Sequence, residues 1–199
     1  MQYVCIEGCM GAGKTTLASL LSKKLNKEIL LEDFERHPFL DDFYTNQTLY
    51  TFETEVCFLL MHYHQTKKAL TNTRQDIISD YYIGKDMLFA YANLNSRREQ
   101  QLFKNMYSYL SEQLKKPELI IHLKASDELI LERIKNRGRE NEKEISIEYI
   151  TKLNKLYDKY FSGTNKDIEI ITVDVDKCDF LLGDTIDEFI FQLKDRHWL

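Results

Sequence analysis

Short apolar runs alternate along this chain with longer stretches in which apolar residues recur every three or four positions. The short runs are typical of buried strands and lie at residues 2–7, 28–32, 75–80, 118–124 and 168–174. The longer stretches predict helices at residues 14–26, 47–70, 84–93, 96–115, 126–137, 146–161 and 183–194. Such alternation is typical of a parallel sheet with helices on its faces, so we expect an α/β fold with five strands in one doubly wound layer.

The size and composition of the chain fit a single domain with its own core. It has 199 residues, of which 43% are hydrophobic and 30% are charged, and these proportions are ordinary for a globular protein. The sequence contains no internal repeat or low-complexity tract, and its prolines are Pro38 and Pro117. We therefore expect one domain over residues 1–199.

The charge and the apolar runs narrow the range of partners. A formal net charge of -5 at pH 7 disfavours nucleic acid, which binds to broad basic surfaces. No apolar run is long enough to cross a membrane, and no basic-then-apolar signal segment precedes the first strand. The four cysteines lack the spacing of a zinc site. These features predict a cytoplasmic protein with reduced thiols that binds small molecules, not nucleic acid, a membrane or zinc.

A phosphate-binding loop directly follows the first strand. Gly8 to Thr15 read G-C-M-G-A-G-K-T, a full match to the pattern G-x-x-x-x-G-K-S/T. The glycines let backbone N–H groups curl around phosphates, Lys14 brings positive charge to the β and γ oxygens, and the Thr15 hydroxyl is a ligand for Mg²⁺. The loop predicts binding of a nucleoside triphosphate through Gly8, Cys9, Met10, Gly11, Ala12, Gly13, Lys14, Thr15 and Thr16.

Two carboxylates follow the second and third predicted strands. Glu32 ends the second strand, where a carboxylate can take a proton from an attacking hydroxyl, so it is the candidate catalytic base. Asp80 ends the third strand and is a candidate to coordinate Mg²⁺ directly or through water. The alternative for each is a solvated acid at a strand end.

Three arginines cluster near the end of the helix predicted at residues 126–137. They are Arg133, Arg137 and Arg139, with Gly138 between the last two. The planar guanidinium group holds spreading phosphoryl charge, so this segment predicts a lid over the nucleotide at residues 133–145. The alternative is a basic helix end that complements the helix dipole.

The chain as a whole resembles the bacterial deoxynucleoside kinase family, in particular its deoxyguanosine kinases. Beyond the phosphate loop, Glu32 and the arginines, the resemblance rests on His37 to Leu40, Phe43-Tyr44, Phe52 to Glu55, Asp80 to Tyr82, Asp86 to Ala90, Thr172 to Asp174 and Asp179-Phe180. It implies a P-loop kinase fold and phosphorylation of a deoxynucleoside 5′-hydroxyl by ATP with Mg²⁺. It also implies a homodimer formed through the long helices at residues 47–70 and 96–115.

The resemblance also implies roles for individual residues. Glu32 is the base, assisted by Lys14, Arg137 and Arg139, while Asp80 lies near the Mg²⁺ that Thr15 also binds. The other implied contacts are Tyr44 and Glu142 to the sugar 3′-hydroxyl, Phe89, Glu55 and Asp86 to the base, Arg133 to the phosphates, and Asp179 and Phe180 to the adenine of ATP.

Glu55 suggests which base is accepted. Many relatives have glutamine at this position, whereas an ionised carboxylate offers acceptors only. Guanine presents two adjacent donors, so deoxyguanosine is the expected substrate, and a wrong base would cost on the order of 1–3 kcal/mol. Asp86 near the same edge favours protonation of Glu55, which would remove this preference. The alternatives are deoxyadenosine or a broad range of deoxynucleosides.

Two positions depart from the family pattern. The segment after the third strand reads Asp80-Tyr81-Tyr82, without the arginine that often supports the catalytic glutamate, so another group must orient Glu32. His62 stands where relatives often carry an arginine near the base, and a packed helix histidine is the alternative for it.

Two other functions share features of this sequence. A nucleoside monophosphate kinase shares the loop and an arginine lid, but acidic Glu32, Glu55 and Asp86 argue against a dianionic acceptor. A nucleotide-binding partner subunit with little activity of its own finds support in Tyr81 alone.

Overall fold

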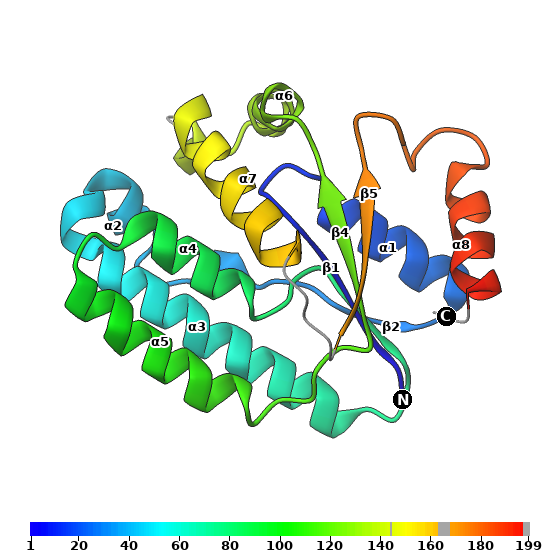
Figure 1. Cartoon of the computed structure of the whole chain (residues 1–199), viewed down its shortest axis with the longest axis horizontal. Coiled ribbons are helices and arrows are strands. Elements are labelled where there is room, and N and C mark those ends of the chain that lie inside the picture. The colour runs from blue at the N-terminus through cyan, green and yellow to red at the C-terminus, as the bar shows by residue number, and fades with distance from the viewer. Residues whose placement is uncertain (144, 163–167, 197–199) are drawn as a thin grey trace.

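Five parallel strands form one sheet in the spatial order β2-β3-β1-β4-β5 (Figure 1). The computed structural model describes residues 1–143, 145–162 and 168–196, without the side chains of Tyr44, Gln47, Thr48 and Asn141. The strands are β1 (Tyr3–Gly8), β2 (Glu28–Leu30), β3 (Ile77–Ser79), β4 (Leu119–Lys124) and β5 (Glu169–Asp174). This sheet is the α/β layer that the alternating pattern predicts.

Helices connect the strands and cover both faces of the sheet. They are α1 (Lys14–Leu25), α2 (Leu40–Thr45), α3 (Gln47–Asn72), α4 (Lys85–Asn93), α5 (Arg97–Ser111), α6 (Asp127–Arg137), α7 (Ile147–Ser162) and α8 (Thr185–Asp195). Two short 3₁₀ turns are η1 (Phe34–Arg36) and η2 (Glu140–Glu142). Within the described ranges, none of these helices is long and apolar enough to cross a membrane.

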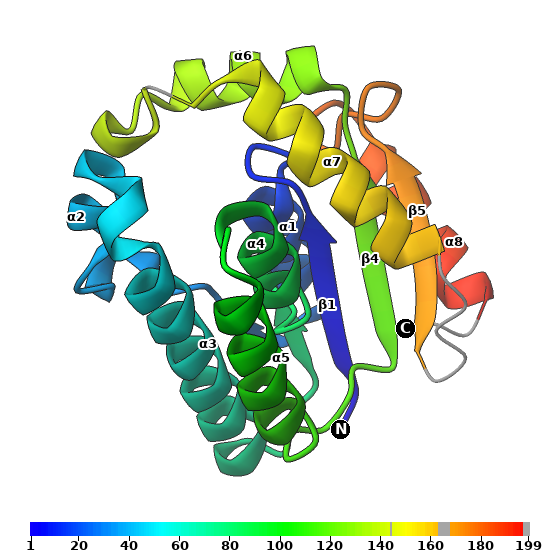
Figure 2. The same cartoon turned by 60° about the vertical axis from the view of Figure 1, so that its left-hand side comes forward.

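The helices form layers on either side of the sheet. In Figure 1, α1 and α8 lie against one face, while α7 and α4 lie against the other, with α3 and α5 outside them. Figure 2 shows α3, α4 and α5 side by side, and α6 lying across the carboxyl ends of β1 and β4. The carboxyl ends of the strands therefore face α6 and the connections around it, where ligands of such folds gather.

Burial explains why β1 reads as a continuous apolar run. All six of its residues are buried, because helices cover both faces of the central strand. The main core joins β1 and β4 to α1, α6, α7 and α8. A second core of Leu59, Ile83, Met87, Ala90, Leu94 and Phe103 joins α3, α4 and α5 into a helical layer beside the sheet.

One residue of β1 is a buried carboxylate that connects three parts of the chain. Glu7 is fully buried and accepts hydrogen bonds from the backbone N–H groups of Gly8, at 3.1 Å, and Tyr82, at 2.6 Å. The Tyr157 hydroxyl donates a third at 3.1 Å. Burial raises the pKa of Glu7, although the positive charge of Lys14 opposes the shift.

Predicted and observed elements agree to within a few residues, and the differences have local causes. Strand β2 ends at Leu30, two residues before its predicted end, because the N–H of Glu32 bonds to the Asp80 side chain instead of a neighbouring strand. Helix α2 was not predicted, since its six residues are too few to show a helical period.

Candidate active site

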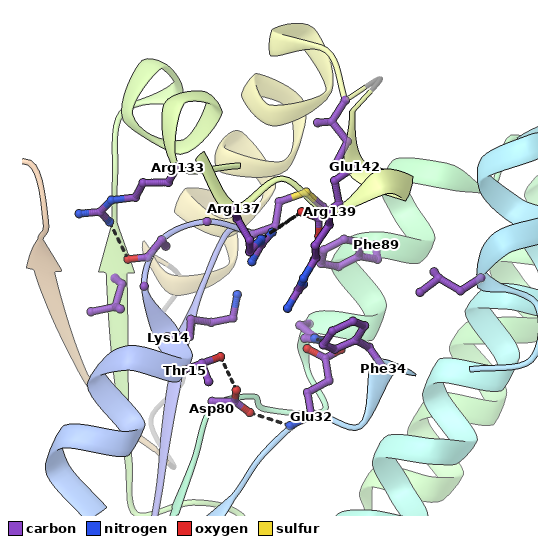
Figure 3. Close-up of a pocket in the computed structure, with 18 of the residues that line it drawn as sticks. Lys14, Thr15, Glu32, Phe34, Asp80, Phe89, Arg133, Arg137, Arg139 and Glu142 are labelled. Carbon is purple, nitrogen blue, oxygen red and sulfur yellow. Dashed lines mark hydrogen bonds and ion pairs between the residues drawn. The ribbon is translucent and has the colours of Figure 1, made fainter. Parts of the chain in front are cut away.

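A large pocket opens at the carboxyl ends of the strands, as expected for this fold (Figure 3). Its volume is about 2070 Å³, above the roughly 300–1,000 Å³ of a typical single-ligand site. The phosphate loop and the end of α6 line one part, and α3 and α4 line another. The pocket therefore has room for two ligands side by side.

The phosphate loop takes its shape from its glycines. Gly8 has φ +152°, and a Cβ there would lie 2.4 Å from the carbonyl oxygen of Leu123, so only glycine fits. Gly13, with φ 101°, caps α1, and the N-terminus of this helix points into the pocket at Lys14. The residues from Met10 to Thr16, for which the motif predicts phosphate binding, line the pocket.

The side chains of Cys9 and Lys14 are both held by the loop. Cys9 is buried beneath it and does not line the pocket, and burial raises the pKa of its thiol to about 12. The ammonium group of Lys14 donates to the carbonyl oxygens of Gly8, at 2.8 Å, and Cys9, at 3.1 Å. Burial lowers the pKa of Lys14, although nearby Glu7 opposes this.

Thr15, Asp80 and Glu32 form a chain of hydrogen bonds beside the loop (Figure 3). The Thr15 hydroxyl donates to Oδ2 of Asp80 at 2.6 Å, and the backbone N–H of Glu32 donates to Oδ1 at 2.8 Å. Asp80 thus holds the backbone of the predicted base and presents a carboxylate beside a hydroxyl. Such an adjacent pair of hard oxygen donors suits Mg²⁺.

The carboxylate of Glu32 faces the pocket and is held by two cations. The ammonium group of Lys85 lies 2.6 Å from its Oε1 atom, and Nε2 of His62 lies 3.1 Å from the same atom. Burial favours the neutral acid, but the charge of Lys85 and the hydrogen bond from His62 outweigh it. The pKa of Glu32 is therefore well below its usual value, and the side chain is ionised.

His62 lies between two carboxylates. Its Nδ1 is 2.8 Å from Oδ1 of Asp86, on the side opposite Glu32. Burial disfavours the charged ring, but Asp86 and Glu32 outweigh it and raise the pKa of His62 to about 9, so the ring is protonated at neutral pH. Tyr81 packs against this ring with centroids 4.7 Å apart. His62 is thus buried behind the pocket wall, where it joins Glu32 to Asp86, and Tyr81 packs against it.

The far end of the pocket carries the groups predicted to read the base. Glu55 is buried and accepts a hydrogen bond at 2.7 Å from the side-chain amide of Asn93. Burial raises the pKa of Glu55 to about 8, so its carboxyl is mostly protonated at neutral pH. Oδ2 of Asp86 has no hydrogen-bond partner among the described residues, and Phe89 lines the wall beside it.

The segment from Arg133 to Lys143, called here the arginine segment, borders the pocket on the side of α6. Oε2 of Glu142 accepts from Arg137 at 2.6 Å, and its Oε1 accepts from Arg139 at 3.2 Å. Arg133 donates at 3.2 Å to the carbonyl of Ala12 in the phosphate loop. Both oxygens of Glu142 therefore engage arginines, and the expected contact of this residue with a sugar hydroxyl stays a prediction.

The remaining predicted contacts lie around the same pocket. Asp179 and Phe180 line it near the phosphate loop, and Phe180 packs against Phe189 at a centroid distance of 5.1 Å. Tyr44 belongs to α2, but its side chain lies outside what the structure describes.

Sequence reasoning missed Lys85 and Asn93, the pocket residues that bond to Glu32 and Glu55. Lys85 opens α4, where a lysine beside an aspartate reads as an ordinary solvated helix start, yet its side chain is only 9% exposed. The available signal was the missing arginine, because an unsupported Glu32 requires a cation and Lys85 lies five residues after Asp80. Asn93 ends the same helix and gives no comparable signal.

The fold and the pocket together define a class of enzyme. A phosphate-binding loop at the end of a parallel sheet, facing an ionised carboxylate across one pocket, is the arrangement of a phosphoryl-transfer enzyme. The family model for deoxynucleoside kinases matches residues 4–196. The chain therefore belongs to the deoxynucleoside kinase family and is a phosphotransferase.

Individual relatives agree with this family. The chain is 38% identical over 187 residues to a deoxyguanosine kinase of Bacillus subtilis (strain 168), covering 91% of this chain and 90% of that protein. It is 33% identical over 175 residues to a deoxyadenosine kinase of Dictyostelium discoideum, covering 86% and 71%. A solved deoxyadenosine kinase from M. mycoides with bound dCTP has a TM-score of 0.85 and 26% identity, covering 98% of this chain and 100% of that one.

Proposed function

We propose that this kinase transfers the γ-phosphoryl group of ATP to the 5′-hydroxyl of a purine deoxynucleoside, with deoxyguanosine as the preferred acceptor. The proposal is carried by one observation, the ionised carboxylate of Glu32 facing the phosphate loop within a single pocket. An ionised carboxylate accepts the proton of the attacking hydroxyl, so the nucleoside lies on the Glu32 side and ATP on the loop side.

The donor half of the site is assigned to the phosphate loop and the arginine segment. Lys14 and the loop N–H groups bind the phosphates, while Arg133, Arg137 and Arg139 neutralise the charge that spreads over the transferred group. Asp179 and Phe180 contact the adenine of ATP. Residues 133–145 of the single domain, which include the arginine segment, act as a lid over the nucleotide.

Thr15 and Asp80 are the residues proposed to hold Mg²⁺. Their oxygen atoms are 2.6 Å apart, a donor set that suits this ion. When bound, Mg²⁺ supplies positive charge that offsets the charge of the phosphates. Asp80 also keeps the backbone of Glu32 in place, so it serves the acceptor half as well.

The acceptor half is assigned to the residues around Glu55. Phe89 stacks on or beside the base, and Tyr44 and Glu142 contact the sugar 3′-hydroxyl. Oδ2 of Asp86, which lacks a partner among the described side chains, is an acceptor aimed at the donors of guanine. The protonated state of Glu55 favours the second candidate, deoxyadenosine, because a neutral carboxyl offers one donor and one acceptor.

The kinase is proposed to be a homodimer that joins through α3 and α5. Both helices expose large apolar side chains, among them Leu60 on α3 and Leu102 and Tyr109 on α5. Exposed apolar residues on neighbouring helices are typical of an interaction surface.

The proposed reaction is tested by assaying the purified chain alone with ATP, Mg²⁺ and each deoxynucleoside. Deoxyguanosine should give the highest kcat/KM above about pH 8, where the Glu55 carboxyl is ionised, whereas binding without product would indicate a partner subunit. Glu32→Gln should lower kcat by about 10²–10⁴ and leave nucleoside binding intact, because a positioned base contributes that factor. Glu28→Gln on the exposed surface of β2 is the matched control. Near-normal turnover of the Glu32 variant would remove that residue from the role of base.

A further inference from the structure

Lys85 occupies the place that an arginine fills in the family pattern. The residue after Asp80 is Tyr81, which points its hydroxyl at Thr66, 3.1 Å away, instead of at Glu32. The cation beside Glu32 comes from α4, where the Lys85 ammonium lies 2.6 Å from Oε1. The ion pair is largely removed from water, since the side chains are 9% and 20% exposed.

The backbone before α4 is built to bring Lys85 into the pocket. A Cβ on Gly84 would lie 2.5 Å from both the Tyr82 ring and the Tyr160 hydroxyl, so the chain passes these rings closely. The N–H of Lys85 bonds to the carbonyl of Tyr82 at 3.0 Å. Its ammonium group lies 5.9 Å from the centroid of the Phe89 ring. A buried ammonium group is costly without a partner, and here the partner is Glu32.

The oxygen atom of Glu32 that Lys85 contacts indicates the role of this ion pair. Lys85 and His62 both contact Oε1 of Glu32, at 2.6 Å and 3.1 Å. Among the described residues, none donates a hydrogen bond to Oε2 of this carboxylate. Two donors on Oε1 fix the rotation of the carboxylate. They leave Oε2 to face the hydroxyl of the nucleoside that accepts the phosphoryl group.

We propose that Lys85 is a positioning residue for Glu32, holding Oε1 so that Oε2 takes the proton from the attacking hydroxyl. The proposal rests on the proposed role of Glu32 as base. The O–H bond of the acceptor breaks and its proton moves to Oε2. The oxygen forms the new bond to the γ-phosphorus of ATP, while the bond from that phosphorus to the β,γ-bridging oxygen breaks and ADP leaves. Lys85 remains protonated throughout and acts only through Glu32.

A double-mutant cycle separates this role from direct contact with the substrate. Lys85→Met should lower kcat by about tenfold to hundredfold, because a misplaced catalytic group costs that order, and should change KM for the nucleoside by less than about threefold. In the Glu32→Gln background, Lys85→Met should cause little further loss. Lys67→Met, an exposed lysine on α3 that contacts Tyr63, is the control and should leave both constants unchanged.

The outcomes distinguish three cases. If Lys85→Met lowers kcat equally with and without Glu32, the lysine acts directly and the proposal is overturned. Wild-type kcat in Lys85→Met also overturns it, whereas wild-type kcat in Glu32→Gln overturns the assignment of the base instead.

A second pair of variants serves if Lys85→Met does not fold, as judged by circular dichroism. Lys85→Arg keeps the charge and should retain more activity than Lys85→Gln. Equal activity of those two variants contradicts the ion pair.

Discussion

At the scale of single residues, the pocket gives two glutamates opposite protonation states. Burial opposes ionisation of both, but Lys85 and His62 outweigh it at Glu32 and keep that pKa well below its usual value. No cation in the described part of the chain bonds to Glu55, and its pKa rises to about 8. Neighbouring charges thus give the two acids different roles. The ionised Glu32 is suited to accept a proton, and the neutral Glu55 is suited to hydrogen-bond to a base.

The state of Glu55 makes base preference depend on pH. Its pKa of about 8 results from burial, with Asp86 raising it and the Asn93 hydrogen bond, Lys85 and His62 lowering it. Below pH 8 the neutral carboxyl suits adenine, and above it the carboxylate suits guanine. The ratio of kcat/KM for deoxyguanosine over deoxyadenosine should therefore rise between about pH 7 and pH 9, by up to about tenfold.

Glu55→Gln is the control for this titration, because an amide does not ionise. The ratio for this variant should not change with pH, and its preference for deoxyguanosine should be weaker than that of the parent at high pH. A parent ratio that stays constant over the same range would contradict the role of Glu55 in reading the base.

Individual site residues could be predicted where a motif ties a residue type to its chemistry. Residues Met10 to Thr16 of the phosphate loop, Glu32, Glu55 and Asp80 all line the pocket. Lys85 could not be placed in the same way, because its importance comes from the turn at Gly84 and from contacts between segments far apart in sequence. The pairing of Glu142 with arginines likewise follows from the fold of the arginine segment and not from any motif.

At the scale of elements, the arginine segment is held together by its own ion pairs. Helix α6 ends at Arg137 and is capped by Gly138, which adopts the left-handed conformation with φ 68° and turns the chain toward Glu142. Arg137 then donates to Glu142 through both Nε, at 3.1 Å, and Nη2, at 2.6 Å. This fork holds the guanidinium group at the edge of the pocket (Figure 3).

Removing the charge of Arg137 tests whether this element serves phosphoryl transfer. Arg137→Met should lower kcat by about 10²–10³, the usual loss for one group that stabilises transition-state charge. Lys135→Met, an exposed change on the same turn of α6, should have no such effect. Single-turnover rates with saturating ATP make the comparison. Equal rates for the two variants would indicate that the segment only complements the helix dipole.

The packing of α7 on β4 depends on a neutral histidine. His122 is 3% exposed and stacks on Phe161 with centroids 4.5 Å apart. Burial lowers its pKa to about 4, although Asp158 opposes this. Since the unfolded chain takes up this proton near pH 6.5 and the folded protein only near pH 4, stability is present above 6.5 and is lost as the pH falls toward 4.

His122→Phe removes this titration and should reduce acid sensitivity. The free energy of unfolding of the variant minus that of the parent should rise by on the order of 2 kcal/mol as the pH falls from about 7 to 4.5. Urea titration at each pH measures both values. His64→Phe, on the exposed side of α3, is a comparison that should show no such change. If the difference in free energy of unfolding between His122→Phe and the parent does not change with pH, the His122 ring is not held in the neutral form by burial.

Elements were predictable where the apolar period is long enough to be read. Each predicted strand and helix is present, because the buried faces of elements such as α7 and β1 set a clear repeat. Helix α2 and the turns η1 and η2 escaped prediction, since three to six residues define no repeat. These short elements border the pocket, where local geometry follows from tertiary contacts.

At the scale of the whole molecule, apolar residues remain exposed on the outer helical layer. Leu102 and Tyr109 on α5 are 49% and 69% exposed, and they lie seven residues apart on one face of the helix. If this layer forms the proposed homodimer, Leu102→Glu should place charges at the interface and halve the mass measured by sedimentation. Phe191→Glu on α8, which is 73% exposed on the other side of the sheet, should leave the mass unchanged. A parent protein that sediments as a monomer would contradict the proposal.

The buried carboxylate of Glu7 links the two halves of the pocket in their local unfolding. Its bonds to Gly8, Tyr82 and Tyr157 join the phosphate loop, the approach to α4 and α7. Releasing any one of these donors leaves a buried group without its partner, at a cost on the order of 1–3 kcal/mol. Amide protons of the phosphate loop and of the segment before α4 should therefore exchange with solvent in one cooperative event. A nucleotide bound at the loop then slows exchange in the segment that carries Lys85, even without touching it.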